Sequence, residues 1–295
     1  MIEAKNVSKS FSDILAVDNV SVTIREGAVF GMIGTNGAGK STFLRMLAGV
    51  LAPDAGTITI DEMPVFENPD AKREFFYISD DQYFFANTTP AELVRYYSVA
   101  YPKFDKERAK KLLSQFGLDE KRKVATFSKG MKKQLSVICG ICANTKYLFC
   151  DETFDGLDPV MRQAVKSIFA QEIAERNMTP VIASHNLREL EDICDHVGMM
   201  HQGKMLLERS LSALQENMVK VQLVMEEALP TELEVVHHTT VGRVQTIIAR
   251  GNAEQIEEVF SKCNPLLCDI LPLSLEEVFI YELGGVDYEV KNVLL

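Results

Sequence analysis

The sequence has no apolar run approaching the ~18–20 residues that a membrane-spanning helix needs. One of the longest, SVICGICA (136–143), is less than half that length. The N-terminal segment MIEAKNVSKS also lacks a basic stretch followed by an apolar one, so no secretory signal is predicted. Together these absences predict a cytoplasmic chain that reaches a membrane only through a partner.

Positive charge is scarce as well. The chain has 31 Lys and Arg against 42 Asp and Glu, a net charge of −11. The excess is concentrated in residues 218–295, which hold five basic residues against 13 acidic ones. Because binding to nucleic acid needs a basic face for the phosphates, nucleic acid is not expected as a partner.

The cysteines show no disulfide or metal pattern. Cys139 and Cys142 form a C-x-x-C, a spacing found in metal and redox sites, but no His or second Cys pair stands near them in the sequence. Their segment has the character of an apolar helix face. We therefore predict buried free thiols in a reducing compartment.

A glycine-rich turn follows the strand-like start of VFGMIGTNGAGKST (29–42) and precedes a helical segment. The turn matches the phosphate-binding loop, G-x-x-x-x-G-K-[ST], at all its fixed positions, Gly34, Gly39, Lys40 and Ser41. In such a loop, backbone N–H groups and a helix N-terminus surround the β-phosphate. The lysine reaches the β- and γ-phosphates and the hydroxyl ligates Mg²⁺. This predicts a site for a nucleoside triphosphate and Mg²⁺.

Two carboxylates follow a second apolar segment, YLFC (147–150), which predicts a short buried strand. Asp151 and Glu152 stand at its C-terminal end, the edge at which open α/β sheets bind ligands. Asp151 fits a residue that holds Mg²⁺, and Glu152 fits a base that accepts a proton from an attacking water. Adjacent acids alone would indicate a solvated turn, but the phosphate loop upstream favours a site.

With these motifs in this order, residues 1–217 resemble the ATP-binding subunits of ABC (ATP-binding cassette) transporters. In that family each ATP lies between the phosphate loop of one subunit and a signature segment, usually LSGGQ, of a second. FSKGM (127–131) stands at that place; it keeps Ser128 and Gly130 but departs from the pattern at Lys129 and Met131. The nucleotide-binding residues that the resemblance implies in the loop and signature are Thr35, Asn36, Gly37, Ala38, Gly39, Lys40, Ser41, Thr42, Ser128 and Gly130.

The resemblance implies three further site residues. Phe11 stands where the family has an aromatic ring that stacks on adenine, although a core Phe is the alternative. His185, which follows a strand-like run, resembles the switch histidine that contacts the γ-phosphate and supports Glu152. Asp158, in GLDP, resembles the D-loop acid that reaches across the dimer to the nucleotide.

The segment YISDDQYFFANTTPAEL (77–93) corresponds to the place where the family has a Gln that senses Mg²⁺ and signals to the membrane subunit. Aligning the aromatic and Thr positions puts Asp80 there, as a third candidate metal ligand beside Ser41 and Asp151. Gln82, two residues later, is the alternative.

The implied fold class is α/β. A P-loop NTPase of the ABC ATPase type is expected over residues 1–217, with a helical subdomain at about 85–143, and a small α+β domain over 218–295. Alternating strands and helices on either side of the helical segment predict a parallel sheet. The strands and helices predicted for the C-terminal domain are, in order, MVKVQLVM, TELEVVHH, VQTIIAR, AEQIEEVFSKC, LLCDILPL and SLEEVFIYELGG.

The resemblance implies an ATPase whose two copies, identical or not, close around two ATP and drive a separate membrane-spanning permease. The chain would then lie at the inner face of the cell membrane. The single cassette with a small C-terminal domain resembles bacterial exporters of the multidrug or antimicrobial-peptide type.

Two alternatives remain for the function. One is a soluble ABC ATPase without a permease; the paired cassettes of translation members and the coiled-coil insertion of repair members are both absent from the sequence. The other is a regulatory cassette that binds ATP without turnover, which Lys129 and Asp80 favour and Glu152 and His185 oppose.

Overall fold

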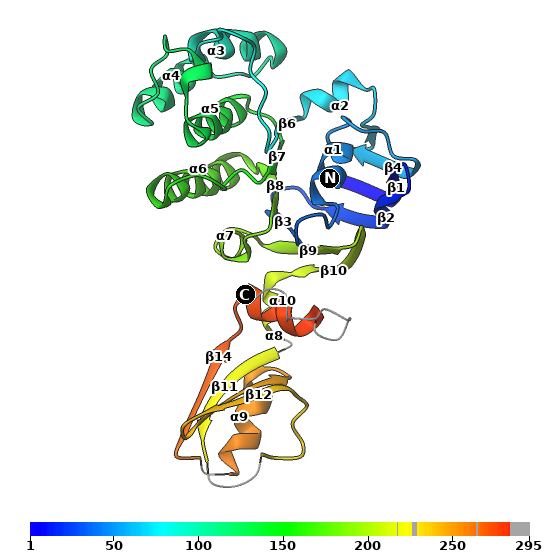
Figure 1. Cartoon of the computed structure of the whole chain (residues 1–295), viewed down its shortest axis with the longest axis vertical. Coiled ribbons are helices and arrows are strands. Elements are labelled where there is room, and N and C mark those ends of the chain that lie inside the picture. Colours follow the sequence, from blue (N-terminus) through cyan, green and yellow to red (C-terminus); the bar gives the residue numbers. More distant parts are fainter. Residues whose placement is uncertain (217, 226–228, 264, 284–295) are drawn as a thin grey trace. The chain divides into compact units, whose positions relative to one another are not determined.

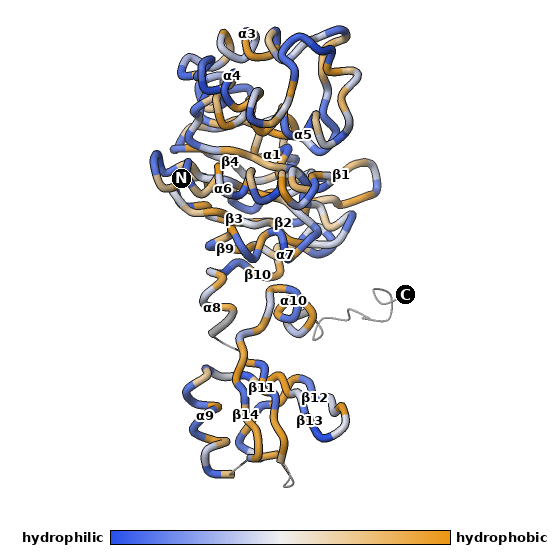
Figure 2. The backbone as a smooth tube through the Cα atoms, turned by 90° about the vertical axis from the view of Figure 1, so that its left-hand side faces the viewer, coloured by the Kyte–Doolittle hydropathy of each residue, from blue (hydrophilic) through white to orange (hydrophobic). Residues whose placement is uncertain are grey.

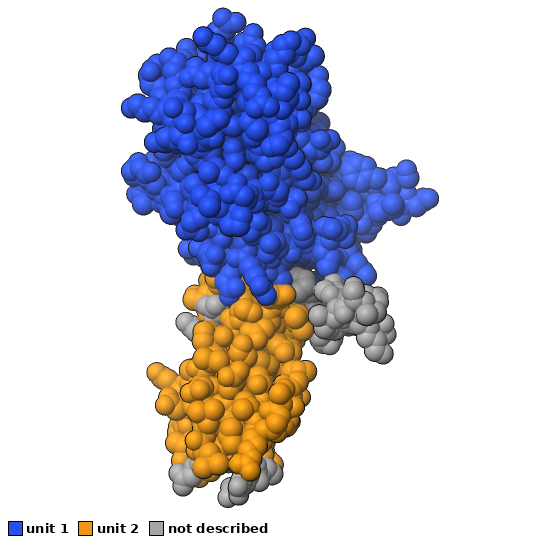
Figure 3. Space-filling view, turned by 60° about the vertical axis from the view of Figure 1, so that its left-hand side comes forward, with its two compact units in different colours: residues 1–208 blue, residues 209–295 orange. Residues whose placement is uncertain are grey.

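The computed structural model describes residues 1–216, 218–225, 229–263 and 265–283. The chain forms two compact units, residues 1–208 and 209–295, which Figure 3 colours separately. The division falls earlier in the chain than the boundary after residue 217 that the sequence indicated.

A six-stranded sheet forms the centre of the first unit (Figure 1); it is parallel except at its edge, where β10 follows β9 as a hairpin. Its strands, in spatial order, are β10 (Lys204–Ser210), β9 (His196–His201), β3 (Phe30–Ile33), β8 (Thr179–Ser184), β7 (Tyr147–Asp151) and β6 (Phe75–Ile78). Every residue of β3, β7 and β8 is buried, as expected for strands of a sheet that is covered on both faces. Parallel pairing of β3 with β8 and β8 with β7 brings their C-terminal ends to one edge.

A second, antiparallel sheet packs beside it. It consists of β2 (Ile14–Ile24), β1 (Ile2–Phe11), β4 (Ala55–Ile60) and β5 (Met63–Pro64), in that spatial order. Helix α1 (Lys40–Leu47) contacts β2 as well as β7 and β8, and its buried Phe43, Leu44 and Leu47 join a core that both sheets share. The phosphate-loop helix is therefore fixed between the two sheets.

The other helices of the first unit lie between residues 69 and 191. They are α2 (Pro69–Arg73), α3 (Pro90–Ala100), α4 (Lys106–Gln115), the short 3-10 helix Val124–Thr126, α5 (Lys129–Cys142), α6 (Pro159–Arg176) and α7 (Leu187–Glu191). Side-chain caps define several starts: the Thr89 and Glu92 side chains form a capping box on α3, and Ser128 caps α5. Cys139 and Cys142 are buried in α5, where burial raises the pKa of both thiols.

The second unit is a four-stranded antiparallel sheet with helices. The strands, in spatial order, are β12 (Val235–Val241), β13 (Val244–Arg250), β11 (Met218–Val224) and β14 (Leu267–Pro272). The helices are α8 (Leu211–Glu216), α9 (Ala253–Ser261) and α10 (Leu275–Leu283). The tube of α9 alternates between hydrophobic and hydrophilic colours in Figure 2, and its buried Ile256 and Phe260 pack in one core with β11 and β13.

The predicted fold class, an α/β P-loop NTPase with helical and small α+β parts, agrees with this architecture. The strand predicted at TELEVVHH (231–238) begins four residues later and continues to Val241, because a turn and bend at residues 231–233 precede β12. The last two residues of the predicted SLEEVFIYELGG helix lie outside the described residues. Within the part of the chain that is described, no helix is long and apolar enough to span a membrane.

Candidate active site

The phosphate loop connects β3 to α1, and its shape depends on glycine. Gly37 and Gly39 have positive φ angles of 81° and 102°. A Cβ atom on Gly39 would lie 2.3 Å from the Ala16 carbonyl oxygen, and one on Gly34 would lie 2.4 Å from the Met200 carbonyl oxygen. Only glycine avoids both the left-handed strain and these backbone contacts.

Lys40 is buried at the start of α1. Its ammonium group donates hydrogen bonds to the carbonyl oxygens of Gly34, at 2.7 Å, and Thr35, at 3.1 Å, and lies 3.8 Å from Glu152 Oε1. Burial lowers the pKa of Lys40, while the nearby carboxylates of Glu152 and Asp151 oppose that shift. The cation thus lies inside the loop, where an anionic ligand gains most from it.

Ser41 and Asp151 join the loop to the end of β7. The Ser41 hydroxyl donates to Asp151 Oδ1 at 2.8 Å, and the Tyr77 hydroxyl donates to Oδ2 at 3.3 Å. Burial raises the pKa of Asp151, although the hydrogen bond from Ser41 lowers it. A hydroxyl and a carboxylate are the oxygen donors that Mg²⁺ prefers, so these two residues fit the ion.

Glu152 and His185 meet at the ends of β7 and β8. His185 Nδ1 lies 2.9 Å from Glu152 Oε2, and the His185 backbone N–H donates to the same oxygen at 3.4 Å. Glu152 itself has a φ of 47°, unusual for a non-glycine residue. Its backbone N–H donates to the Ala183 carbonyl oxygen at 2.9 Å, which ties this strained residue to β8.

Lys40, Ser41 and Glu152 line a cavity of about 460 Å³, and Asp151 and His185 contact two of these residues from outside the lining. Its lining comprises Ile14, Leu15, Ala16, Asn36, Gly37, Ala38, Gly39, Lys40, Ser41, Thr42, Asp80, Glu152, Gln202 and Gly203. Phe11, expected to stack on adenine, is not part of this lining; it is 44% exposed, and the Lys9 ammonium lies 5.8 Å from its ring centre. The exposed apolar side chains beside the loop are instead Ile14 and Leu15.

Asp80 lines the cavity and contacts Lys133. From the sequence, this lysine was interpreted either as a solvated residue or as one that attracts the nucleotide, and neither interpretation predicts its burial beside Asp80. Lys133 Nζ lies 3.2 Å from Asp80 Oδ1 and also donates a hydrogen bond to the Glu152 carbonyl oxygen. The alternative residue, Gln82, has its side-chain amide buried with no hydrogen-bond partner among the described residues. Helical spacing does give a signal for Lys133 in the sequence. It stands four residues before Val137 and eight before Ile141, which places it on the apolar face of α5.

The signature residues lie apart from the cavity of their own chain. The Ser128 hydroxyl accepts a hydrogen bond from the Met131 backbone N–H, and a Cβ atom on Gly130 would lie 3.0 Å from the Gly156 carbonyl oxygen. Asp158 caps α6 through the backbone N–H groups of residues 160 and 161. The structure therefore brings the loop, Asp80, Asp151, Glu152 and His185 together in one chain, but leaves Ser128, Gly130 and Asp158 outside that group.

Known proteins resemble the chain along most of its length. Residues 17–155 match the family described as ABC transporter. The ABC transporter ATP-binding protein YtrB of Bacillus subtilis (strain 168) is 31% identical over 97% of this chain and 99% of its own length. The bacitracin transport ATP-binding protein BcrA of Bacillus licheniformis is 28% identical over 97% of this chain and 98% of its own.

A solved ATP-binding subunit of an ABC transporter superposes with a TM-score of 0.69 and 26% identity, over 73% of this chain and 92% of that one. The match with YtrB extends through both compact units, so the relationship is not confined to the phosphate-loop motif. Sequence, fold and site geometry agree, and the chain belongs to the ABC transporter family as one of its ATP-binding proteins.

Proposed function

We propose that this chain hydrolyses Mg²⁺-ATP and that two copies, closing around two ATP, drive export through a separate membrane-spanning permease. One observation carries the proposal: at the C-terminal edge of the parallel sheet, Glu152 lies between Lys40 and His185, with Ser41 and Asp151 beside it. Phosphate-binding, metal-binding and proton-accepting groups are thus within reach of one another.

In this mechanism the loop N–H groups and Lys40 hold the β- and γ-phosphates. Ser41 and Asp151 would hold Mg²⁺, which would supply neutralisation of the charge on the phosphate oxygens. Glu152 orients the attacking water and accepts its proton, and His185 fixes the direction of that carboxylate. The Asp80 carboxylate also lines the cavity and is a third candidate ligand for the metal or its water.

The dimer is proposed from the position of the signature residues. Ser128 and Asp158 cap the N-termini of α5 and α6, and helix N-termini favour anions, yet neither residue lines the cavity of its own chain. A second copy that presents these two helix starts to the cavity would complete the phosphate site, with Gly130 allowing close approach. A solved bacterial ABC transporter cassette that is described as dimeric supports this arrangement; it superposes with a TM-score of 0.65 and 21% identity, over 72% of this chain and 99% of that one.

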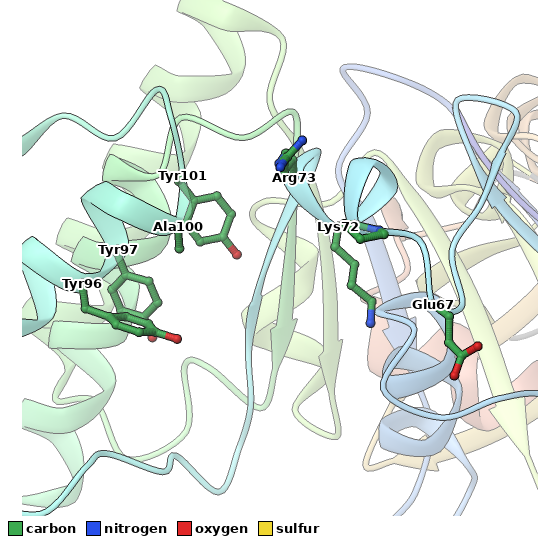
Figure 4. A pocket seen from close by; sticks show the side chains of 8 residues that line it. Glu67, Lys72, Arg73, Tyr96, Tyr97, Ala100 and Tyr101 are labelled. Carbon is green, nitrogen blue, oxygen red and sulfur yellow. The ribbon is translucent and has the colours of Figure 1, made fainter.

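The permease is proposed to dock on the helical subdomain. A cavity of about 480 Å³ lies between α2 and α3, with Tyr96, Tyr97 and Tyr101 on one side and Lys72 and Arg73 on the other (Figure 4). Beside it, Tyr83 and Phe85 are exposed, and their rings and that of Tyr96 follow one another at 5.9 and 5.8 Å. Exposed aromatic groups of this kind mark contact surfaces, and these follow directly on Asp80 in the chain.

The direction of transport is proposed from the relatives. BcrA is a bacitracin transport protein by name, and a further relative, the linearmycin resistance ATP-binding protein LnrL of Bacillus subtilis (strain 168), is 31% identical over 70% of this chain. One name states transport of bacitracin and the other resistance to linearmycin. Because removal of a compound from the cell would give both transport and resistance, the names favour export of an antimicrobial compound.

The first test is Glu152→Gln in the full chain. The variant should bind ATP, lose turnover and elute as a dimer with Mg²⁺-ATP but not with Mg²⁺-ADP, while Glu175→Gln, on exposed α6 surface, should behave as the native chain. Retained turnover in Glu152→Gln would overturn the proposed base. A pull-down from detergent-solubilised membranes tests the permease: a stoichiometric multi-span partner supports export, whereas recovery from the soluble fraction alone favours an ABC ATPase without a permease.

A further inference from the structure

A buried lysine links three parts of the first unit. Lys133 lies near the start of α5, and its side chain is 1% exposed. Lysine is almost never this buried unless it is paired. Its ammonium group contacts the Asp80 carboxylate on one side and the Glu152 carbonyl oxygen on the other.

The contact with Glu152 matters because of the backbone there. Glu152 has a φ of 47°, and a non-glycine residue in this region stores strain that its surroundings must hold. Its backbone N–H donates to the Ala183 carbonyl oxygen of β8. Its C=O accepts from Lys133 and, at 3.2 Å, from the backbone N–H of Asp155 in the following turn. Both ends of the residue that bears the carboxylate are therefore held, one by the sheet and one by the signature helix.

We propose that Lys133 is a positioning residue, which sets the Glu152 backbone and so aims its carboxylate at His185, and that Asp80 is the counter-ion of Lys133. The inference rests on the proposed role of Glu152 in hydrolysis. It adds a direct connection, through one ammonium group, from the signature helix and the Asp80 segment to the proposed base. It also assigns Asp80 a role that competes with metal binding, since a carboxylate paired with Lys133 has less to offer Mg²⁺.

The partners differ in exposure in a way that makes the test practicable. Asp80 is 45% exposed, so its charge stays solvated when Lys133 is replaced. Lys133→Met keeps the length and the apolar stem of the side chain and removes only the ammonium group. Lys132→Met is the matched control, because Lys132 is the adjacent residue and is not buried.

The kinetic test compares Lys133→Met, Lys133→Arg and Lys132→Met. In Lys133→Met, kcat should fall by about 10–100-fold, as for a misplacement of about 1 Å at a reacting group, with the Kd for a fluorescent ATP analogue within about twofold. Lys133→Arg should recover part of kcat, since a guanidinium also donates. Native kcat in Lys133→Met, or loss of ATP affinity equal to the loss of kcat, would overturn the inference.

Asp80→Asn separates its two roles. A counter-ion predicts a smaller loss of kcat than in Lys133→Met, no further loss in the double variant, and an unchanged Mg²⁺ requirement. An Mg²⁺ requirement raised about tenfold in Asp80→Asn would overturn the counter-ion assignment.

A readout that needs no turnover keeps the inference separate from the proposed function. In the chain without nucleotide, labelled with ¹³C-histidine, the imidazole signal of His185 (assigned with His185→Ala) should shift in Lys133→Met and stay in place in Lys132→Met. A native chain without ATPase activity would overturn the proposed function, whereas an unmoved His185 signal in Lys133→Met would overturn the positioning role.

Discussion

Glu152 Oε2 lies 2.9 Å from His185 Nδ1, although the two residues end different strands and are separated by the whole of α6. The parallel register of β7 with β8 brings them together, since Asp151 pairs with Ala183. The contact between Glu152 and His185 therefore depends on the register of the two strands, which an 18-residue helix and its turns connect.

His185→Ala should therefore reduce turnover rather than binding. Loss of the group that orients a general base is expected to lower kcat by about 10²-fold or more. The Kd for ATP should change by only a few fold, because the phosphate loop and Lys40 are untouched. The measurement is steady-state ATPase activity beside a binding titration, with His238→Ala in the second unit as the control; native kcat in His185→Ala would contradict the assignment.

Tyr77→Phe tests the support of the metal site. The Tyr77 hydroxyl donates to Asp151 Oδ2, the oxygen that Ser41 leaves free. Removing a partner that orients a metal-binding carboxylate typically costs 10–100-fold in metal affinity, so we expect the Mg²⁺ requirement of hydrolysis to rise by about tenfold.

The control for this change is Tyr83→Phe, because Tyr83 is 83% exposed and does not line the cavity. A Mg²⁺ titration of ATPase activity measures both variants. Equal requirements in the two would place the Tyr77 hydroxyl outside the metal site.

Gly39→Ala and Gly37→Ala form a matched pair in the phosphate loop. Both positions have positive φ, so each alanine should cost about 1–2 kcal/mol of backbone strain. At Gly37 nothing lies within 4 Å of the added Cβ, whereas at Gly39 the Ala16 carbonyl oxygen is 2.3 Å away. Gly39→Ala should thus abolish detectable ATP binding and Gly37→Ala should weaken it about tenfold, as measured by the fluorescent analogue; equal losses would show that strain alone decides.

The sequence predicted the parts of the site that depend on consecutive residues. The phosphate loop, the paired acids after β7 and the histidine after β8 are each local patterns, and strand ends in a parallel sheet converge by topology. The sequence did not predict the hydrogen bond from Lys133 to the Glu152 carbonyl oxygen. That contact depends on how α5 packs against the end of β7, which no local pattern gives. Tertiary packing also decides the cavity lining: the hairpin of β1 and β2 brings Ile14 and Leu15 to it but not Phe11, whose stacking on adenine stays a prediction.

Asp151→Asn should make the chain more stable and inactive. Burial raises the pKa of Asp151 above that of the unfolded chain, so the folded protein holds this proton more tightly. The stability that follows from this is complete below the unfolded pKa, about 4, and is lost as the pH rises through the folded pKa. At neutral pH the native state therefore contains a buried carboxylate that disfavours folding.

Asparagine removes that charge and keeps an oxygen that accepts from Ser41, so the Tm of the chain without nucleotide should rise at pH 7, and the gain should shrink as the pH falls towards about 4. ATPase activity should be lost, because a neutral amide binds Mg²⁺ poorly. Thermal unfolding between pH 4 and 8 measures the effect, with the exposed Asp13→Asn as the control. A Tm that falls at pH 7 would mean that the hydrogen bonds of the carboxylate outweigh its burial, whereas a rise with loss of turnover identifies Asp151 as a residue retained for metal binding at the expense of stability.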